Sequence, residues 1–477
     1  MVVLAIDQGT SGTKALVRDV GGEILAVEET PVRPSYLGEG AVEIDPQILL
    51  DSVIDAGRRA LAAAGNPAVR AVALSNQGET VMAWDRDTGR PLSAAIIWQD
   101  RRAEGICKEL ADSRDMVAAK TGLVLDPYFS APKMVWLRRN VTDRGVVTTT
   151  DTWFIHQLTG EFVTDVDTAT RSLLVDIDEL AWDDELLSTF GFQDEPLPRI
   201  VGNDEIIGST SAFGGDIPVG GLILDQQAAM AAQGCLVPGS LKCTYGTGAF
   251  MFANAGERAV RSPSGLTTSA AWKLRDRTDY CLDGQVYAAG SALRWLVDLG
   301  LLSTPTALDL ECADSNEGVT FVPALAGLAA PWWSPRPAAS FIGMGLSTGS
   351  EHLVRAVVES IAAQVAVVAR NAADEMARPL ERLRVDGGLT ASNALMQAQA
   401  DLVQVPVDVY PSPHATALGT AMMGELSLAD DLRLEGAVES WTPAATYEPQ
   451  WSADQAKEFL AVWGTAVQAT VAGGENP

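Results

Sequence analysis

The sequence is poor in the residues that build metal centres and disulfide frameworks. It holds three histidines and five cysteines in 477 residues. The cysteines are odd in number and widely spaced, and none forms a CxxC pair or a metal-ligand spacing. We therefore expect reduced thiols in the core of a cytoplasmic protein. The histidines are scattered, which favours surface or capping roles over metal ligation.

Basic residues are also scarce. Lysine and arginine total 34 against 62 aspartates and glutamates, which gives a formal net charge of −28. Nucleic acids and anionic membranes are bound through basic surfaces, so neither is expected as a partner of this chain. Only seven of the basic residues are lysines, and both salt adaptation and a GC-rich genome remain open as explanations.

Long hydrophobic runs are missing as well. The longest apolar runs are too short to cross a bilayer or are interrupted by proline, as in 321–333. No positively charged segment with an apolar core precedes the first motif, so we expect no targeting signal. Because 477 residues exceed what one hydrophobic core usually holds, two domains are expected.

The stretch 222–233 combines an apolar run, one acid and a helical pattern. Asp225 stands where the predicted strand becomes a helix. An aspartate there can cap the helix, because its carboxylate accepts backbone N–H bonds at the positive end of the helix dipole. The same position is the C-terminal edge of a sheet, where α/β proteins bind ligands, so an ionised carboxylate could serve as a base. The pattern alone leaves both roles open.

Two segments, 2–19 and 239–254, read as a strand, a Gly–Thr turn and a second strand. The first turn follows Asp7 and contains Thr10, Ser11, Gly12 and Lys14. Small residues and hydroxyls let backbone N–H groups approach a phosphate, and Asp7 could hold a hydrated Mg²⁺. The Walker spacing is absent. An ordinary hairpin turn is the alternative, but two such hairpins facing each other would cradle a polyphosphate.

Polar and aromatic residues follow the predicted strands between the two hairpins. Gln77 and Glu79 offer hydrogen-bond donors and acceptors, whereas Trp98 and Tyr128 offer flat apolar surfaces with a polar edge. Such a set suits a small hydroxylated molecule, whose C–H faces stack on rings while its hydroxyls bond carboxylate and amide groups. Core packing remains the alternative for each residue taken alone.

The second half continues the alternation of strands and helices. Residues 383–397 read as a strand, a Gly–Gly turn and a helix, and a flat ring or a ribose could lie on the backbone at Gly387 and Gly388. A close-packed helix start is the alternative. Helical periodicity marks 45–64, 351–376 and 415–423, and the tail from Gly473 is expected to be disordered.

Taken in order, these motifs resemble the FGGY family of carbohydrate kinases, and within it most closely the glycerol kinases. The matching segments are Asp7-Gln-Gly-Thr-Ser, Asn76-Gln77, Trp98-Gln-Asp-Arg-Arg, Asp126-Pro-Tyr-Phe-Ser, Thr164-Asp-Val, Asp225-Gln-Gln-Ala-Ala, Thr244-Tyr-Gly-Thr-Gly, Gly327-Leu-Ala-Ala-Pro, Asp386-Gly-Gly and Thr416-Ala-Leu-Gly. Ordered matches over this length are specific for the family, and less so for the substrate.

The resemblance implies an α/β fold of two actin-like (ribonuclease H-like) ATPase domains with a cleft between them. The expected boundaries are 1–233 for an N-terminal domain on the substrate and Mg²⁺ side, 234–430 for a C-terminal domain on the nucleotide side, and 431–477 for an extension packed on the domains. The implied cofactors are ATP and Mg²⁺, and the implied substrate is a small polyol or sugar such as glycerol, a tetritol or a pentulose. A homodimer is also allowed, because the family is often dimeric.

The resemblance also implies roles for individual residues. Asp225 is the expected general base, which takes the proton from the attacking hydroxyl, and Asp7 and Asp225 mark the expected Mg²⁺ site. The expected glycerol pocket consists of Gln77, Gly78, Glu79, Trp98, Tyr128, Asp225, Gln226 and Phe250. The expected phosphate loops contain Thr10, Ser11, Gly12, Lys14, Thr247 and Gly248. The nucleotide is expected at Gly290, Arg294, Gly387, Gly388, Ser392 and Asn393.

Two positions depart from the glycerol kinase pattern. Gly78 stands where glycerol kinases carry an arginine whose guanidinium bonds glycerol hydroxyls, so a forked donor is lost and volume is expected to open beside the substrate. Losing charge-assisted bonds of about 1.5–3 kcal/mol would weaken glycerol binding roughly ten- to a hundred-fold. A longer polyol or ketose, such as a tetritol or a pentulose, is expected to fill the space. The second departure is Pro337-Ala-Ala-Ser340, where the family commonly has Ala-Arg-Gly.

A carbohydrate kinase is thus the leading interpretation of the sequence. The alternative is a non-catalytic actin-like sugar sensor or assembly protein that uses the ATP cleft structurally. Asp225 argues against this alternative, because a sensor need not keep an ionised acid at the acceptor site.

Overall fold

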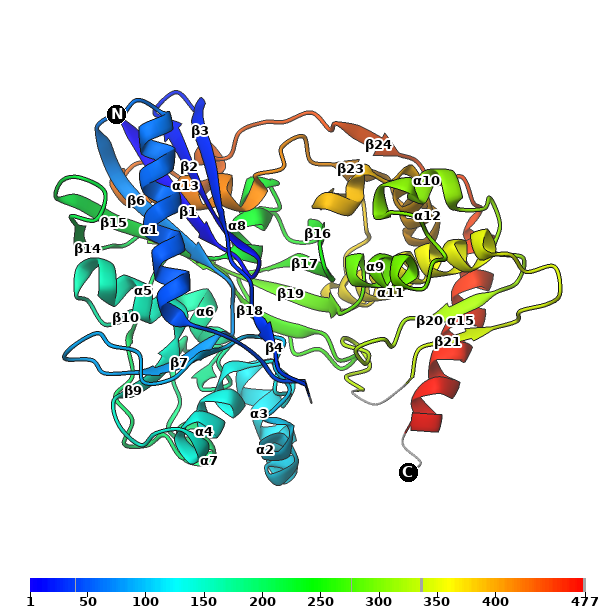
Figure 1. The fold of residues 1–477 in the computed structure, drawn as a ribbon, viewed down its shortest axis with the longest axis horizontal. Coiled ribbons are helices and arrows are strands. Elements are labelled where there is room, and N and C mark those ends of the chain that lie inside the picture. The colour runs from blue at the N-terminus through cyan, green and yellow to red at the C-terminus, as the bar shows by residue number, and fades with distance from the viewer. Residues whose placement is uncertain (39, 276, 335–337, 475–477) are drawn as a thin grey trace.

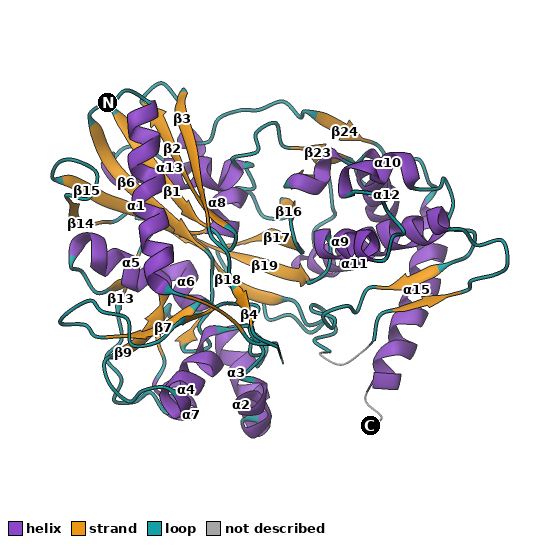
Figure 2. Cartoon of the chain, in the orientation of Figure 1, coloured by secondary structure: helices purple, strands orange, loops and turns teal. Residues whose placement is uncertain are grey.

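The molecule consists of two lobes, each built around a mixed β-sheet that carries helices (Figures 1 and 2). The structure is a computed structural model that describes residues 1–38, 40–275, 277–334 and 338–474. Pro337, the first residue of the second departure named above, therefore lies outside the described residues. All five cysteines are free thiols, and four of them are buried.

The first sheet forms the core of the N-terminal lobe. Its strand order is β14 (Ile206–Thr210), β15 (Ile217–Leu224), β6 (Val69–Asn76), β1 (Val2–Gln8), β2 (Gly12–Asp19) and β3 (Ile24–Pro31). Alternate residues of a strand point to opposite faces. Leu4 and Ile6 of β1 pack with helix α1 (Pro46–Ala63), whereas Val3 and Ala5 pack with helix α13 (Ala415–Leu428). The helix expected at 45–64 is confirmed, and Asp45 caps it.

Helix α13 follows the second sheet in the sequence but packs on the first. It lies against helix α8 (Asp225–Ala232) so closely that a Cβ atom on Gly419 would stand 1.9 Å from the carbonyl oxygen of Ala228. Only glycine allows this approach of the two backbones. Residues within the segment 234–430 therefore contribute to the core of the N-terminal lobe.

A smaller five-stranded sheet completes the N-terminal lobe. Its order is β4 (Ser35–Tyr36), β5 (Val42–Ile44), β8 (Ala95–Ile96), β7 (Val81–Trp84) and β9 (Val146–Thr149). The helices that accompany it in the sequence are α2 (Glu104–Glu109), α3 (Arg114–Thr121), α4 (Ser130–Asn140), α5 (Thr150–Thr159), α6 (Val166–Thr170) and α7 (Asp184–Phe190). Trp98 and Tyr128 both pack with the hydrophobic cluster between this sheet and α4.

The second sheet forms the core of the C-terminal lobe. Its order is β18 (Thr267–Lys273), β19 (Thr278–Val286), β17 (Ala249–Gly256), β16 (Leu241–Tyr245), β22 (Leu383–Asp386), β23 (Val407–Val409) and β24 (Ala445–Tyr447). Strand β16 pairs antiparallel with β17 and parallel with β22, as β1 pairs antiparallel with β2 and parallel with β6. Both hairpins predicted from the sequence are thus confirmed, and they occupy equivalent places in the two lobes.

Helix α11 (Ser350–Met376) is the long core helix of the C-terminal lobe. By length and composition it could cross a membrane, although charged residues such as Glu359 and Arg370 interrupt its apolar runs. However, 78% of its most apolar 18-residue window is buried inside the fold. Its hydrophobicity serves packing against the second sheet, where it shares one cluster with helices α9 (Gly290–Asp298) and α12 (Asn393–Val403).

The C-terminal segment packs on the second lobe. Helix α15 (Ala453–Gly474) buries Trp463, whose indole N–H donates to the carbonyl of Phe321 and to the hydroxyl of Ser360, both at 3.1 Å. The helix includes Gly473 and Gly474, so the expected disorder does not begin at Gly473. Residues 475–477 lie outside the described residues.

Candidate active site

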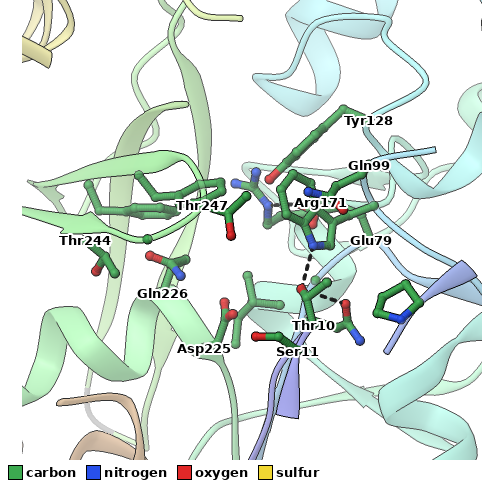
Figure 3. Close-up of a pocket in the computed structure, with 18 of the residues that line it drawn as sticks. Thr10, Ser11, Glu79, Gln99, Tyr128, Arg171, Asp225, Gln226, Thr244 and Thr247 are labelled. Carbon is green, nitrogen blue, oxygen red and sulfur yellow. Dashed lines mark hydrogen bonds and ion pairs between the residues drawn. The ribbon is translucent and has the colours of Figure 1, made fainter. Parts of the chain in front are cut away.

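A pocket of about 460 Å³ lies between the two lobes. The residues of the sequence prediction that line it are Thr10, Ser11, Gln77, Gly78, Glu79, Trp98, Tyr128, Asp225, Gln226, Thr247, Phe250 and Arg294. Figure 3 shows Thr10, Ser11, Asp225 and Thr247 around the same space. The fold therefore brings most of the predicted acceptor and phosphate-turn residues to one site.

The tips of the two hairpins are built alike. The N–H of Gly9 donates to the carbonyl of Gly12 at 2.9 Å, and the N–H of Gly246 donates to the carbonyl of Gly248 at 2.8 Å. The start of α9 packs on the second tip, because a Cβ atom on Gly290 would lie 2.6 Å from the oxygen of Gly246. The tips present the hydroxyl side chains of Thr10, Ser11 and Thr247 to the pocket.

Other predicted residues do not line this pocket: Asp7, Gly12, Lys14, Gly248, Gly290, Gly387, Gly388, Ser392 and Asn393. Gly387 has φ 97°, and a Cβ atom there would lie 2.3 Å from the carbonyl oxygen of Tyr245. Ser392 caps α12, and its hydroxyl donates to Asp309 at 2.6 Å. The backbone N–H of Asn393 donates to the same carboxylate at 2.8 Å. Close packing of a helix start therefore accounts for these contacts.

Asp225 is the first residue of α8, and Leu224 occupies the N-cap position without a side-chain cap bond. The predicted capping role is therefore wrong by one residue, since the helix begins at Asp225 itself. Burial raises the pKa of Asp225 to about 6, with a further contribution from Glu79, while Lys242 and the N–H of Gln226 oppose the rise. A carboxylate with this pKa is mostly ionised at neutral pH and is well matched to accepting a proton.

Lys242 is a buried cation beside Asp225 that the sequence reading did not single out. Its ammonium donates to Gln226 Oε1 at 2.5 Å and to Thr244 Oγ1 at 2.9 Å. It also lies 5.0 Å from the ring centre of Phe252. Burial lowers the pKa of Lys242, and the charges of Asp386 and Asp225 counteract that effect.

Asp7 is the second carboxylate near the hairpin tips. Burial raises its pKa to about 7, the charge of Asp225 adds to the rise, and Lys14 and the hydroxyl of Ser75 oppose it. Two carboxylates that repel each other favour a divalent cation between them. Among the described residues, no group of three or more His, Cys, Asp or Glu side chains could hold a metal. Mg²⁺ usually takes one or two carboxylates, waters and substrate phosphates, so this donor set fits Mg²⁺.

Glu79 is held by a guanidinium from a distant part of the chain. Arg171 directly follows α6 and donates through Nε to Glu79. Through Nη1 it donates to Asp283 of β19, at 3.0 Å. All three side chains are at most 3% exposed. Burial raises the pKa of Glu79, and the charge of Arg171 opposes that rise. Because Asp283 belongs to the second sheet, this triad also links the two lobes.

The aromatic residues meet at the acceptor side of the pocket. The ring centre of Trp98 lies 5.7 Å from that of Tyr128 and 5.6 Å from that of Phe250, both edge to face. The indole N–H of Trp98 donates to Thr10 Oγ1 at 2.9 Å. Lys133, which is fully buried, donates to the backbone carbonyls of Pro127 and Phe129 and holds the loop that carries Tyr128.

The side chain of Leu224 occupies part of the volume expected beside Gly78. A Cβ atom on Gly78 would lie 3.1 Å from Leu224 Cδ1 and 3.4 Å from Cδ2. The side chain of Leu224 therefore limits the space on the Cβ side of residue 78, where open volume was expected, while Gly78 itself lines the pocket. The predicted loss of a forked donor at position 78 is unaffected, because the neighbouring side chain of Leu224 is aliphatic and cannot donate a hydrogen bond.

Several pocket residues were missing from the prediction: Pro34, Tyr36, Gln99, Arg171, Leu224, Thr244, Gly246 and Phe252. Gln99, Thr244 and Gly246 belong to segments that carry the family resemblance and could have been named from it. Leu224 precedes Asp225 but reads as strand core. Arg171 and Phe252 carry no local signal in the sequence.

Two family models match most of the chain. Residues 2–232 match the N-terminal domain of the FGGY family of carbohydrate kinases, and residues 241–428 match the C-terminal domain of that family. The glycerol kinase of Leptothrix cholodnii is 39% identical to the chain, over 98% of this chain and 99% of that protein. Glycerol kinase 2 of Thermotoga maritima is 38% identical, over 98% of each.

Solved structures agree with this result. The structure of Plasmodium falciparum glycerol kinase with ADP is 31% identical in sequence and aligns with a TM-score of 0.89 over 98% of each chain. The ligand-bound xylulose kinase of Lactobacillus acidophilus has a TM-score of 0.90 over 99% of each chain at 21% identity, a likeness of fold. The predicted two-domain α/β architecture is confirmed.

Proposed function

Because the chain belongs to the FGGY family of carbohydrate kinases, which phosphorylate polyols or sugars with ATP, we propose that its acceptor is a small polyol or ketose held between Glu79 and Asp225. Candidate acceptors are glycerol, a tetritol and a pentulose. The observation that carries this proposal is the convergence of both hairpin tips and Asp225 on one pocket with an aromatic wall. The reaction would take place in the cytoplasm, without nucleic acid or membrane.

Asp225 acts as the general base. Its carboxylate accepts the proton of the acceptor hydroxyl as that oxygen attacks the γ-phosphorus of ATP and the bond to ADP breaks in line. Phosphoryl transfer needs alignment and charge neutralisation more than covalent help from the protein. The raised pKa of about 6 supports this role, because a base near the working pH both ionises and accepts a proton readily.

The two hairpin tips cradle the phosphates of ATP. The hydroxyls of Thr10, Ser11 and Thr247 line the pocket and provide donors without bulky side chains. Asp7 and Asp225 would hold Mg²⁺, which neutralises phosphate charge during transfer. Arg294 faces the same pocket from α9 and supplies a further positive charge.

The acceptor side separates polar from apolar contacts. Glu79, oriented by Arg171, accepts hydrogen bonds from acceptor hydroxyls. Trp98, Tyr128 and Phe250 stack on the C–H faces of the acceptor and keep water from the phosphoryl group. The nucleotide base and ribose are assigned to the Gly387–Gly388 turn, where no atom lies within 4 Å of a Cβ position built on Gly388.

A coupled assay of ADP release tests the proposal. Purified protein receives ATP, Mg²⁺ and one of glycerol, erythritol, xylulose or ribulose, and a reaction without acceptor measures background hydrolysis. We expect ADP release that depends on at least one acceptor, with an equal amount of phosphorylated acceptor. ADP release that is the same with and without every acceptor would contradict the proposal and favour a sensor.

A further inference from the structure

We propose that Leu224 makes the acceptor pocket selective for a deoxy carbon, so that the acceptor is a polyol or ketose with a methyl or methylene group against Leu224. The inference concerns the substrate class and rests on the proposed function. It starts from one contact, the side chain of Leu224 lying over Gly78 inside the pocket.

The contact narrows the space on the Cβ side of position 78 and makes that side apolar. Three atoms of the isobutyl group, Cδ1, Cδ2 and Cγ, lie 3.1, 3.4 and 3.6 Å from a Cβ built on Gly78. Leu224 is 2% exposed, although it lines the pocket. Its methyl groups therefore form a fixed wall next to the proposed base.

Leu224 is anchored on both sides of its backbone. It is the last residue of β15, where it stands in parallel register with Asn76 of β6. Its N–H donates to Asp167 Oδ2 at 2.7 Å, and Asp167 Oδ1 accepts a bond of 2.6 Å from Asn203. Asn203 also donates to the carbonyl of Leu222 at 2.7 Å. These bonds hold the backbone of β15 in place and keep the side chain of Leu224 on the side of the strand that faces Gly78.

Gln77, one of the two polar neighbours of Gly78, makes two side-chain hydrogen bonds. Gln77 Oε1 accepts from the hydroxyl of Thr10 at 3.0 Å, and Gln77 Nε2 donates to Gln8 at 3.3 Å. A hydroxyl placed against the methyl groups of Leu224 would lose water there and gain no hydrogen bond from that side chain, whereas a methyl group would gain contacts. On the other side, Glu79 remains available to bond hydroxyls. The pocket therefore matches an acceptor that is hydroxylated at one end and deoxygenated at the other.

Matched acceptor pairs test this inference with the unaltered protein. The pairs are glycerol with propane-1,2-diol, and erythritol with butane-1,2,3-triol, which differ by one hydroxyl. We expect kcat/KM to be higher for the deoxy member of at least one pair by about ten-fold or more. Higher kcat/KM for the hydroxylated member of both pairs, or equal values, would overturn the inference.

Two variants assign the effect to Leu224. Leu224→Asn keeps the branched shape of the side chain and adds hydrogen-bonding groups, so we expect it to reverse the preference within each pair. Leu224→Met is the matched apolar control and should keep the preference. A Leu224→Asn variant with an unchanged ratio would overturn the assignment.

Absence of any kinase activity would contradict the proposed function and can be distinguished from failure of the inference about Leu224. If no acceptor is phosphorylated, the melting temperature with each member of a pair and a non-hydrolysable ATP analogue still reports binding. A larger stabilisation by the deoxy member supports the role of Leu224, and a smaller or equal one contradicts it.

Discussion

Asp225 lies between opposing electrostatic influences. Burial and the charge of Glu79 raise its pKa, and the ammonium of Lys242 lowers it. As the proposed base, Asp225 must be ionised to accept a proton, so we expect activity to be lost as the pH falls through the pKa of this carboxyl. We therefore expect Lys242 to set the lower pH limit of the reaction, although it does not line the pocket itself and donates hydrogen bonds to the lining residues Gln226 and Thr244.

We predict that Lys242→Met moves the acid limb of the kcat/KM profile upward by on the order of one pH unit, because the lost cation no longer favours the charged carboxylate. The measurement is kcat/KM for the preferred acceptor between pH 5 and pH 8. The control is Lys457→Met, since Lys457 is exposed on α15. An acid limb that stays in place or moves downward would show that Lys242 does not act on the base.

Site residues that belong to a local sequence motif could be predicted from the sequence. The Gly–Thr turns can be recognised in the sequence because glycine and hydroxyl residues cluster between two apolar strands. Arg171 could not be found in this way, because its partner Glu79 stands 92 residues away and no periodicity connects them. The same holds for Leu224, whose apolar side chain reads as strand core until the fold places it over Gly78.

At the scale of elements, the contact of α8 with α13 positions the proposed base. Helix α8 begins at Asp225, and α13 packs against it where Gly419, which has no side chain, meets the backbone carbonyl of Ala228. The periodicity predicted both helices. Their contact was not predictable, because α13 comes after the second sheet and nothing local assigns it to the first.

We expect Gly419→Ala to lower the free energy of unfolding by more than about 2 kcal/mol, because the new methyl group cannot coexist with the Ala228 carbonyl. Gly464→Ala in α15 is the matched control, with nothing within 4 Å of its Cβ position. It should stabilise the protein by roughly 0.5–1 kcal/mol through helix propensity. Urea unfolding of both variants measures the difference, and equal midpoints would contradict the proposed contact.

At the scale of the whole molecule, charge is the dominant property. A net charge of −28 destabilises the compact state through self-repulsion. Buried links between the lobes, such as Arg171 with Glu79 and Asp283, are screened little by salt, and exposed ion pairs contribute little in any case. The composition predicted this charge but not the distribution of buried ion pairs.

We therefore predict that the melting temperature rises when NaCl is increased from about 0.02 M to about 0.3 M, since the Debye length shortens across that range and repulsion weakens. Differential scanning calorimetry of the ligand-free protein at constant pH gives the result. A melting temperature that falls with NaCl would mean that attractive surface pairs outweigh the net charge.

The role of Asp225 as the base is tested most directly by kcat/KM of Asp225→Asn with ATP and the preferred acceptor. The substitution keeps the shape of the side chain and removes its capacity to accept the proton. We predict a loss of about 10²–10⁴-fold with little change in melting temperature, because burial already disfavours the charged carboxylate. A variant whose kcat/KM stays within about ten-fold of the unaltered protein would contradict the assignment of Asp225 as the base.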